Sequence, residues 1–228
     1  MSLEFIVSEI SQGIIVTLEL TALGMLGGFI LGFPLAVARA YSKGFFRWLS
    51  IGYIELIRGT PMLLQLYLIG FGLPLLIREY FPTFVMNVFW AAVIGMMLNS
   101  AAYQAEYIRG AFTAIESGQT EAGIAMGMSK WQIIMKIIFP QAFRIMLPSW
   151  TNEIIYLLKY SSLAMLLAVP EIMYQAKVVA AATFMYAEVW LIVALIYLIF
   201  ALIITHVMRV VEKKLYIPGV TMIRRGAI

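Results

Sequence analysis

The sequence predicts an all-α membrane protein with about five transmembrane helices, in a single domain covering residues 1–228. Hydrophobic residues make up 63% of the chain and charged residues 12%, and the mean hydropathy is +0.93, so there is too little polar surface for a water-soluble domain. Several apolar stretches also reach the roughly 20 residues that a helix needs to cross a hydrocarbon core about 30 Å thick. We expect spans at about 12–40, 48–77, 84–112, 140–169 and 186–210.

Charged residues are sparse within these stretches. Four runs contain none, namely 20–38, 59–77, 80–105 and 189–208. The fourth span is interrupted between residues 145 and 169 only by Glu153 and Lys159. We therefore expect a span that tolerates two ionisable groups.

Basic residues predict the orientation of the spans, because cytoplasmic connections of membrane proteins are enriched in Lys and Arg. They follow the first span, precede the fourth and follow the last: Arg39, Lys43 and Arg47; Lys130, Lys136 and Arg144; Arg209, Lys213, Lys214, Arg224 and Arg225. This places the N-terminus outside and the C-terminus in the cytoplasm, as an odd number of spans requires. The first residues carry Glu4 and Glu9 and no cleavage pattern, so we expect no cleaved signal peptide.

The composition lacks residue types on which many enzymes depend. The chain has no cysteine, no aspartate and one histidine, His206, which excludes thiol catalysis, an aspartyl dyad and a His-rich metal site. A G-x-x-x-x-G-K phosphate-binding loop is also missing, so we expect no nucleotide site in this chain. The net charge of +4 reflects membrane topology, and we expect no nucleic-acid partner.

The segment from 117 to 138, between spans three and four, is too polar to cross a membrane. It predicts two short helices, the first ending at Gly127 and the second beginning with a capping box of Ser129 and Gln132. Pro140 then marks the junction with span four. Small residues at 122, 123 and 125 suit a surface that another protein approaches closely. The pattern fits equally well an amphipathic stretch lying on lipid headgroups.

Glu55 and Arg58 lie three residues apart on one helix face and can neutralise each other. Gly59, Thr60 and Pro61 follow, and proline disfavours helix at the residue before it, so span two is expected to break or kink there. Broken helices in membranes are tolerated where they face protein or a water-filled cavity. A structural ion pair at the cytoplasmic end is the simpler interpretation of Glu55.

Span three carries a polar stripe, formed by Asn99, Tyr103, Glu106 and Gly110 with Arg109 beside it. Such a stripe faces away from lipid. It could line a transport path or hydrogen-bond to a neighbouring helix. The second interpretation is favoured for Glu106 and Arg109.

In span four, Glu153 and Lys159 lie about 120° apart around the helix, so they are not natural partners. Ionisable groups in a membrane are costly and indicate function. A substrate with both an ammonium and a carboxylate would suit the pair, with Asn152, Ser161 and Ser162 adding hydrogen bonds. The alternative is pairing with another span, for instance Glu153 with Arg58; the site is favoured.

Four runs, in this order, resemble permeases of the polar amino-acid uptake family of ABC importers, which have the type I fold: ELIRGTPMLLQL, NSAAYQAEYIRGA, EAGIAMGMSKWQIIMKIIFPQA and NEIIYLLKYSSL. The third run is similar to the EAA loop of these permeases. Glu121, Ala122, Gly127 and Pro140 match its motif, whereas Gly123 stands where the family usually has alanine. The tail at 220–228 lies outside the pattern and has no assigned role.

The resemblance implies a permease subunit of an ATP-driven importer for polar or basic amino acids in the inner membrane of a prokaryote. Its partners would be an ABC ATPase dimer, a second permease copy, identical or related, and an extracytoplasmic solute-binding protein, with ATP and Mg²⁺ bound by the ATPase and no cofactor bound by this chain. The expected substrate-binding residues are Glu153, Asn152, Lys159, Arg58, Thr60, Asn99, Ser100 and Tyr103. The expected ATPase-coupling residues are Glu121, Ala122, Gly123, Gly127 and Met128.

A secondary amino-acid transporter and a channel subunit are the alternatives, although secondary transporters usually contain an internal repeat and none is visible here. A membrane-embedded enzyme fits less well, since aspartate and cysteine are missing. The amino acid remains open among arginine, histidine, lysine and glutamine.

Overall fold

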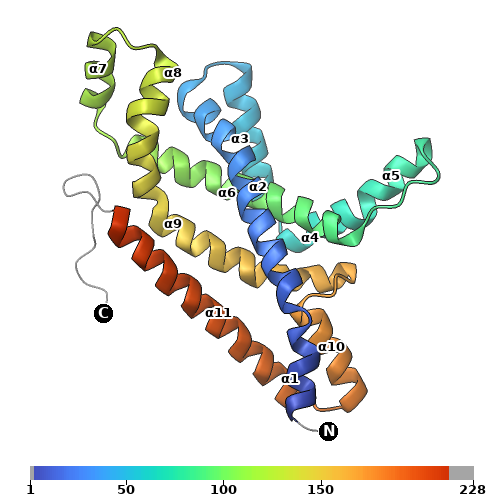
Figure 1. The fold of residues 1–228 in the computed structure, drawn as a ribbon. Helices are drawn as coiled ribbons and strands as arrows, with labels where there is room; N and C mark the ends of the chain where they lie inside the picture. Colours follow the sequence, from blue (N-terminus) through green and yellow to red (C-terminus); the bar gives the residue numbers. More distant parts are fainter. Residues whose placement is uncertain (1–2, 216–228) are drawn as a thin grey trace.

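The computed structural model describes residues 3–215, and every regular element in that range is helical (Figure 1). The first half contains α1 (Leu3–Ser11), α2 (Ile14–Tyr41), α3 (Phe45–Arg58), α4 (Met62–Tyr67), the π-helix η1 (Leu68–Gly72), α5 (Leu73–Tyr80) and α6 (Val88–Thr113). The second half contains α7 (Ser117–Ala125), α8 (Lys130–Ile133), the π-helix η2 (Ile134–Ile138), α9 (Phe139–Tyr160), the 3-10 helix η3 (Ser161–Leu167), α10 (Ile172–Thr183) and α11 (Tyr186–Leu215). Arg224, Arg225 and the tail at 220–228 lie outside the described residues.

Four helical stretches are long and apolar enough to cross a membrane, namely Glu4–Tyr41, Met62–Tyr80, Val88–Thr113 and Tyr186–Leu215. A fifth arises if Lys130–Leu167 and Ile172–Thr183, which meet at a bend of 53°, are one broken span. The all-α fold class with about five spans is confirmed. The sequence did not predict α1 or α10, because α1 adjoins the first span and α10 lies in an expected connection.

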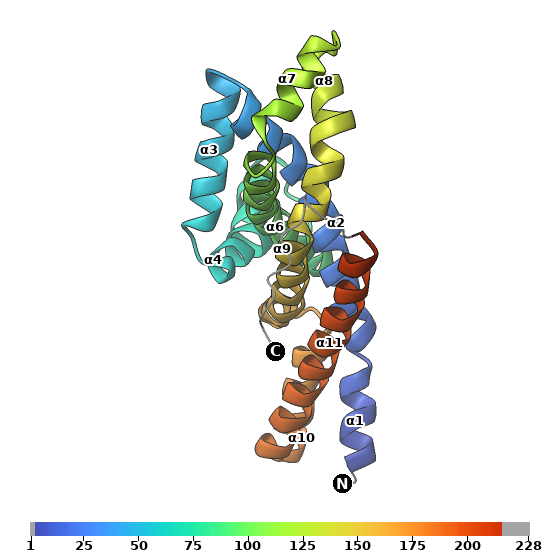
Figure 2. The ribbon, with the colours of Figure 1, turned by 90° about the vertical axis from the view of Figure 1, so that its left-hand side faces the viewer.

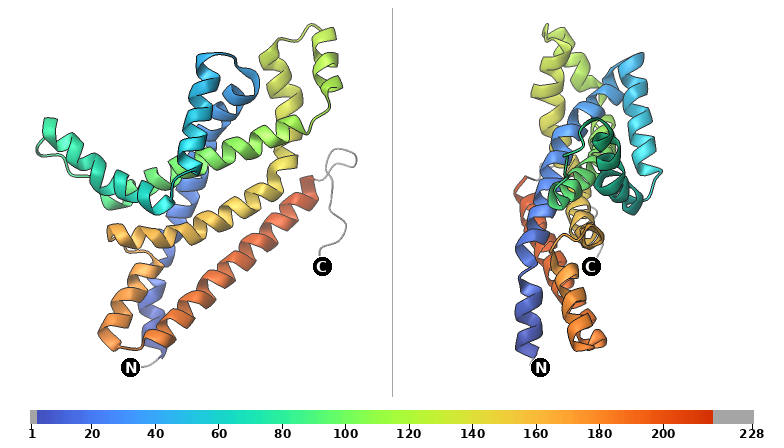
Figure 3. Two further views of the ribbon diagram at one scale, coloured as in Figure 1. Left: turned by 180° about the vertical axis from the view of Figure 1, so that it is seen from behind. Right: turned by 90° about the vertical axis from the view of Figure 1, so that its right-hand side faces the viewer.

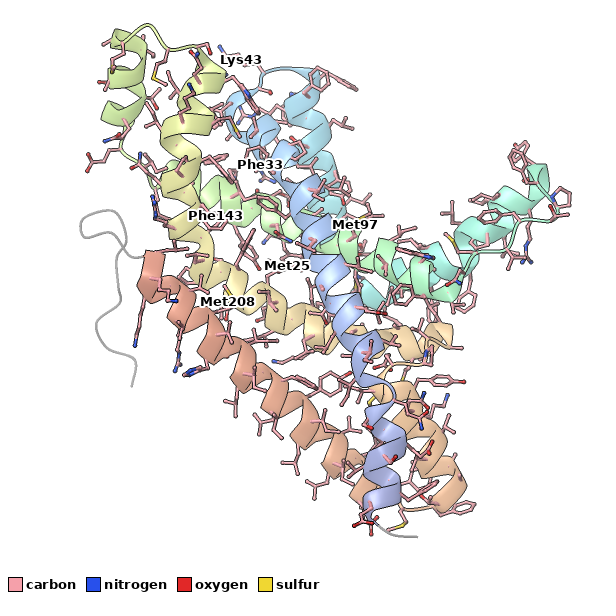
Figure 4. All side chains as sticks on the ribbon, in the orientation of Figure 1. Met25, Phe33, Lys43, Met97, Phe143 and Met208 are labelled. Atoms are coloured by element: carbon pink, nitrogen blue, oxygen red, sulfur yellow. The ribbon has the colours of Figure 1, made fainter. Side chains whose placement is uncertain are left out.

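Helices α2 and α6 cross in close contact at the centre of the molecule. Three glycines spaced four apart, Gly24, Gly28 and Gly32, lie on the face of α2 that meets α6. A Cβ atom at Gly28 would lie 2.7 Å from Cβ of Ser100, and one at Gly32 would lie 2.8 Å from a backbone oxygen of α6. Figure 4 labels Met25 and Met97 near this crossing. Small residues at this spacing are the usual means of close helix packing in membranes.

The break expected in span two is confirmed. Helix α3 ends at Arg58, residues 59–61 are not helical, and α4 begins at Met62. Instead of one span over 48–77, α3 packs beside α2, α4 and η1 pack along α6, and α5 projects from the body of the molecule (Figures 1 and 3).

The first helix, the turn and the capping box predicted for residues 117–138 are confirmed. Helix α7 ends before Gly127, which has a φ of 74°, and Ser129 and Gln132 form the expected capping box. The second helix is not short, which corrects the prediction: α8, η2 and α9 follow one another without a break through Pro140. Proline lacks a backbone N–H, and the wider π-helical turn of η2 immediately before it accommodates that loss.

The two ends of the molecule differ in composition. Helices α7 and α8 and the turn between α2 and α3 project to one end, whereas α1, α10 and the start of α11 lie at the other (Figures 1 and 2). Lys43 and Lys130 lie at the first end, where Figure 4 labels Lys43. The opposite end is held together by an apolar cluster that includes Ile6, Ile10 and Ile172.

Candidate functional site

A buried polar network joins α2, α6 and α9 beside the glycine crossing. The hydroxyl of Ser100 donates to Oε1 of Glu153 over 2.7 Å. Nε2 of Gln104 donates to the Ser100 oxygen and to the backbone oxygen of Met25, both at 2.9 Å. Ser100 and Gln104 are fully buried, and Glu153 is 4% exposed. The network therefore fixes the Glu153 carboxylate in the interior of the bundle.

No cationic side chain pairs with Glu153 among the residues that the structure describes. The proposed pairing of Glu153 with Arg58 is therefore not observed. Within the same range, Oε1 of Gln104 is buried without a hydrogen-bond partner. A buried carboxylate without a counter-charge is costly, so such a group in a membrane indicates a functional site.

Four tyrosines, two from α6 and two from α9, form a group beside this carboxylate: Tyr103, Tyr107, Tyr156 and Tyr160. Tyr107 and Tyr160 interact electrostatically with Glu153, and Tyr103 and Tyr156 interact with those two tyrosines. The rings of Tyr156 and Tyr160 are stacked with centroids 6.3 Å apart. We call these four residues with Glu153 the tyrosine–glutamate face. Aromatic faces beside a carboxylate attract cations.

Lys159 and Asn152 do not join Glu153. Both are exposed and share one side of α9 with Tyr156, whose ring centroid is 5.8 Å from the Lys159 ammonium. The structure therefore does not bring Glu153 and Lys159 together to hold both ends of one small zwitterion. The side chains of Ser161 and Ser162 donate to carbonyls of the last turn of α9, so they complete the helix end.

Thr60 and Asn99 belong to a hydrogen-bond network at the break between α3 and α4. Nε2 of Gln65 donates to the backbone oxygens of Ile57, at 2.7 Å, and Thr60, at 3.0 Å, and also to the Thr60 hydroxyl. Nδ2 of Asn99 donates to the Gln65 oxygen over 2.8 Å. Because Gln65 is 6% exposed, the carbonyls freed by the break are satisfied inside the protein.

Arg58 and Tyr103 belong partly to a second, structural cluster around Glu106. The Glu106 carboxylate lies 2.9 Å from Arg109, 3.2 Å from Arg39 and 3.8 Å from Arg58. Glu55 pairs with Arg39 at 3.1 Å and not with Arg58, which corrects the expected pair. The Arg58 guanidinium also lies 5.3 Å from the ring centroid of Tyr103. The structural interpretation of Glu106 and Arg109 agrees with these contacts.

The five expected coupling residues divide into three groups. Glu121 and Ala122 are exposed on α7, next to Met126, which is 81% exposed. Gly123 faces inward, where a Cβ atom would lie 2.8 Å from Ile133, and Met128 packs against the core. The small size of Gly123 therefore serves contact within the chain and not the approach of a partner. Gly127 shapes the turn.

Five residues of these networks were not predicted from the sequence: Gln65, Gln104, Tyr107, Tyr156 and Tyr160. Two of them could have been predicted from their spacing. Gln104 lies four residues after Ser100, and Tyr107 lies four after Tyr103, so both extend the polar stripe of α6. Gln65 carries no such signal, because its partners are backbone carbonyls that only the folded break exposes.

Comparisons with known proteins agree with this architecture. Residues 24–216 match the family model described as binding-protein-dependent transport system inner membrane component. Among curated relatives, the arginine transport system permease protein ArtQ of Bacillus subtilis is 37% identical over 206 residues, covering 90% of this chain and 92% of ArtQ. The glutamine transport system permease protein GlnP of Escherichia coli is 36% identical with the same coverage.

A solved structure described as an amino acid ABC transporter with histidines is also similar. It superposes with a TM-score of 0.80 at 32% identity, covering 91% of this chain and 94% of the solved chain. These relatives are permeases and not enzymes, in agreement with the composition. The chain therefore belongs to the family of binding-protein-dependent transport system inner membrane components.

Proposed function

We propose that this chain is the permease subunit of an ATP-driven importer of polar or basic amino acids, and that Glu153 receives the cationic group of the substrate. The observation that carries the proposal is the buried Glu153 carboxylate, which has neutral hydrogen-bond donors around it and no cation among the described residues. The substrates named for ArtQ and GlnP, arginine and glutamine, both carry an α-ammonium, and arginine adds a guanidinium.

The tyrosine–glutamate face supports a cationic ligand. Tyrosine rings attract ammonium and guanidinium groups, with contributions of about 0.5–2 kcal/mol each. The exposed side of α9 bearing Asn152, Tyr156 and Lys159 is too polar for lipid, so it suits a water-filled path or a second permease copy. In this proposal Lys159 lies along the path, on a different side of α9 from Glu153.

The α7 segment is the proposed contact with the ATPase. It projects from the end of the molecule that carries the basic connections, and it exposes Glu121, Ala122 and the apolar Met126. Its inner face is fixed by the contact of Gly123 with Ile133. A push on α7 would therefore reach α8 and, through the continuous helix, α9 and Glu153. ATP and Mg²⁺ belong to the partner ATPase, since this chain has no phosphate loop.

The proposal places the N-terminus outside, the C-terminus in the cytoplasm and the chain in the inner membrane of a prokaryote. A solute-binding protein would deliver the amino acid at the end formed by α1 and α10. A second permease copy, identical or related, would complete the path.

The experiment compares wild type with Glu121→Lys in vesicles that contain the chain, its ATPase and its binding protein. We expect uptake of labelled arginine or glutamine to require ATP. Glu121→Lys should release the ATPase, because it reverses a charge on the exposed face of α7. The control Glu188→Lys reverses an exposed charge at the opposite end, on the first turn of α11, and should leave ATPase association unchanged.

Two results would contradict the proposal. Uptake that proceeds without the ATPase and follows an ion gradient would identify a secondary transporter. Equal association of the ATPase with Glu121→Lys and with wild type would remove α7 from the interface.

A further inference from the structure

A basic cavity lies between α7 and the adjoining ends of α2, α3 and α6. Its volume is about 510 Å³, and its polar lining consists of Arg39, Arg47, Arg109, Tyr41, Thr113 and Thr120. A water molecule takes about 30 Å³ of liquid volume, so the cavity has room for a group of many atoms. Neither the tyrosine–glutamate face nor Glu121 lines it.

The charge of the cavity is positive. Three guanidinium groups line it and, within the described part of the chain, no carboxylate does. Arg39 and Arg109 are partly neutralised by Glu55 and Glu106, which do not line the cavity.

Arg47 forms no ion pair within residues 3–215. Its guanidinium is therefore available for an anion. Arginine binds phosphate oxygens with two parallel hydrogen bonds, which makes several arginines around one cavity typical of a phosphate site.

The position of the cavity favours a lipid as the source of the phosphate. Arg47 lies in the first turn of α3 between Phe46 and Trp48, which are 67% and 72% exposed, and Phe45 is 73% exposed. Exposed aromatic residues of this kind are enriched at the level of lipid headgroups. The same end of the molecule carries Lys43, labelled in Figure 4.

We propose that this cavity binds the phosphate of an anionic phospholipid headgroup and that the bound lipid holds α7 against the helix bundle. Arg47 of α3, Arg109 of α6 and Thr120 of α7 all line the cavity. A lipid in this place would bridge the bundle and the segment proposed to contact the ATPase. Coupling would then depend on the lipid composition of the membrane. This site is independent of the proposed substrate site.

The test measures lipid binding to the full chain in detergent by native mass spectrometry. The probes are phosphatidylglycerol and phosphatidylcholine, each with and without millimolar inorganic phosphate. We expect Arg47→Gln to weaken phosphatidylglycerol binding about fivefold, because one basic residue fewer meets the headgroup. The matched control Lys136→Gln removes the positive charge of an exposed η2 residue outside the cavity. It should change binding less than about twofold.

Phosphatidylcholine binding and the unfolding temperature should be the same in both variants, which separates loss of the site from loss of folding. Equal phosphatidylglycerol binding by Arg47→Gln and Lys136→Gln would overturn the proposal. Inorganic phosphate should compete, because it meets the same arginines. Arg47-dependent binding of inorganic phosphate without any Arg47-dependent binding of phosphatidylglycerol would identify a soluble phosphate as the ligand and would overturn the lipid assignment. Weaker association of the ATPase with Arg47→Gln, without any phosphatidylglycerol binding, would identify a protein contact instead.

Discussion

Glu106 and Glu153 are two carboxylates in neighbouring helices with opposite surroundings. Glu106 on α6 lies within 4 Å of Arg39, Arg58 and Arg109, so the chain supplies its counter-charges. Glu153 on α9 receives hydrogen bonds only from neutral groups within the described residues, among them the Ser100 hydroxyl at 2.7 Å. At Glu106 the cost of placing a carboxylate in a membrane protein is met by cations of the chain itself. At Glu153 no cation of the described residues meets this cost, and we propose that the substrate does.

The largest expected effect concerns Glu153→Gln. Glutamine keeps an acceptor for the Ser100 hydroxyl but removes the charge, so folding should be retained while the substrate cation loses its partner. Loss of one member of a buried charge pair costs about 2–5 kcal/mol, so amino-acid uptake should fall at least about 30-fold. Uptake assays in vesicles measure this effect, with Glu188→Gln on α11 as the control for charge removal. Normal uptake would assign Glu153 to a structural role.

Glu106→Gln should lower stability and leave uptake nearly unchanged, which is the reverse of the result expected for Glu153→Gln. It leaves Arg39, Arg58 and Arg109 without their shared carboxylate, and the free energy of unfolding should fall by about 2 kcal/mol. This is less than for a fully buried pair, because the side chains of Arg58 and Arg109 are 39% and 36% exposed. Thermal unfolding in detergent measures the loss. Uptake per folded molecule should change little. A selective loss of uptake at unchanged stability would show that Glu106 acts in transport, as Glu153 is proposed to do, and not in folding.

Gln65→Leu tests whether the break between α3 and α4 is held by side-chain hydrogen bonds. The change leaves the Ile57 and Thr60 carbonyls and the Asn99 amide without their partner, at a cost of about 1–3 kcal/mol for buried polar groups. Cleavage by a protease near residues 59–61 should become faster. Gln119→Leu on exposed α7 is the control, and equal cleavage rates in the two variants would show that Gln65 is dispensable.

The smallest expected effect is that of Tyr156→Leu, which removes one ring from the tyrosine–glutamate face. A cation–π contribution of about 1 kcal/mol corresponds to about a fivefold higher KM for uptake, with maximal rate nearly unchanged. Tyr156→Phe keeps the ring and should remain within about twofold of wild type. If both changes raise KM equally, the hydroxyl and not the ring face contacts the substrate.

The sequence predicted the elements that depend on local pattern. Apolar runs predicted about five spans, although not the bounds of the second; Pro61 predicted the break, and Gly127 and Ser129 predicted the turn after α7. It did not predict that α8 continues into α9, because a π-helical turn before Pro140 is invisible in a hydrophobic pattern.

The candidate site was predicted only in part, since it depends on which side of each helix meets another. Glu153 and Ser100 were found separately, and only the close crossing that Gly28 permits brings Ser100 and Gln104 into the core beside Glu153. Lys159 was expected to share the substrate with Glu153 although the helical spacing separates them by about 120°; the structure buries Glu153 and leaves Lys159 exposed. Ion pairs between helices, such as Arg39 with Glu106, cannot be read from spacing within one helix.

The most direct test of the central claim is equilibrium binding of labelled arginine and glutamine to the purified permease assembly carrying Glu153→Gln, with Glu106→Gln measured beside it. Our account predicts that Glu153→Gln weakens binding at least about 30-fold, whereas folded Glu106→Gln binds as wild type does. Binding by Glu153→Gln within about twofold of wild type would contradict the claim that this buried carboxylate receives the cation of the substrate.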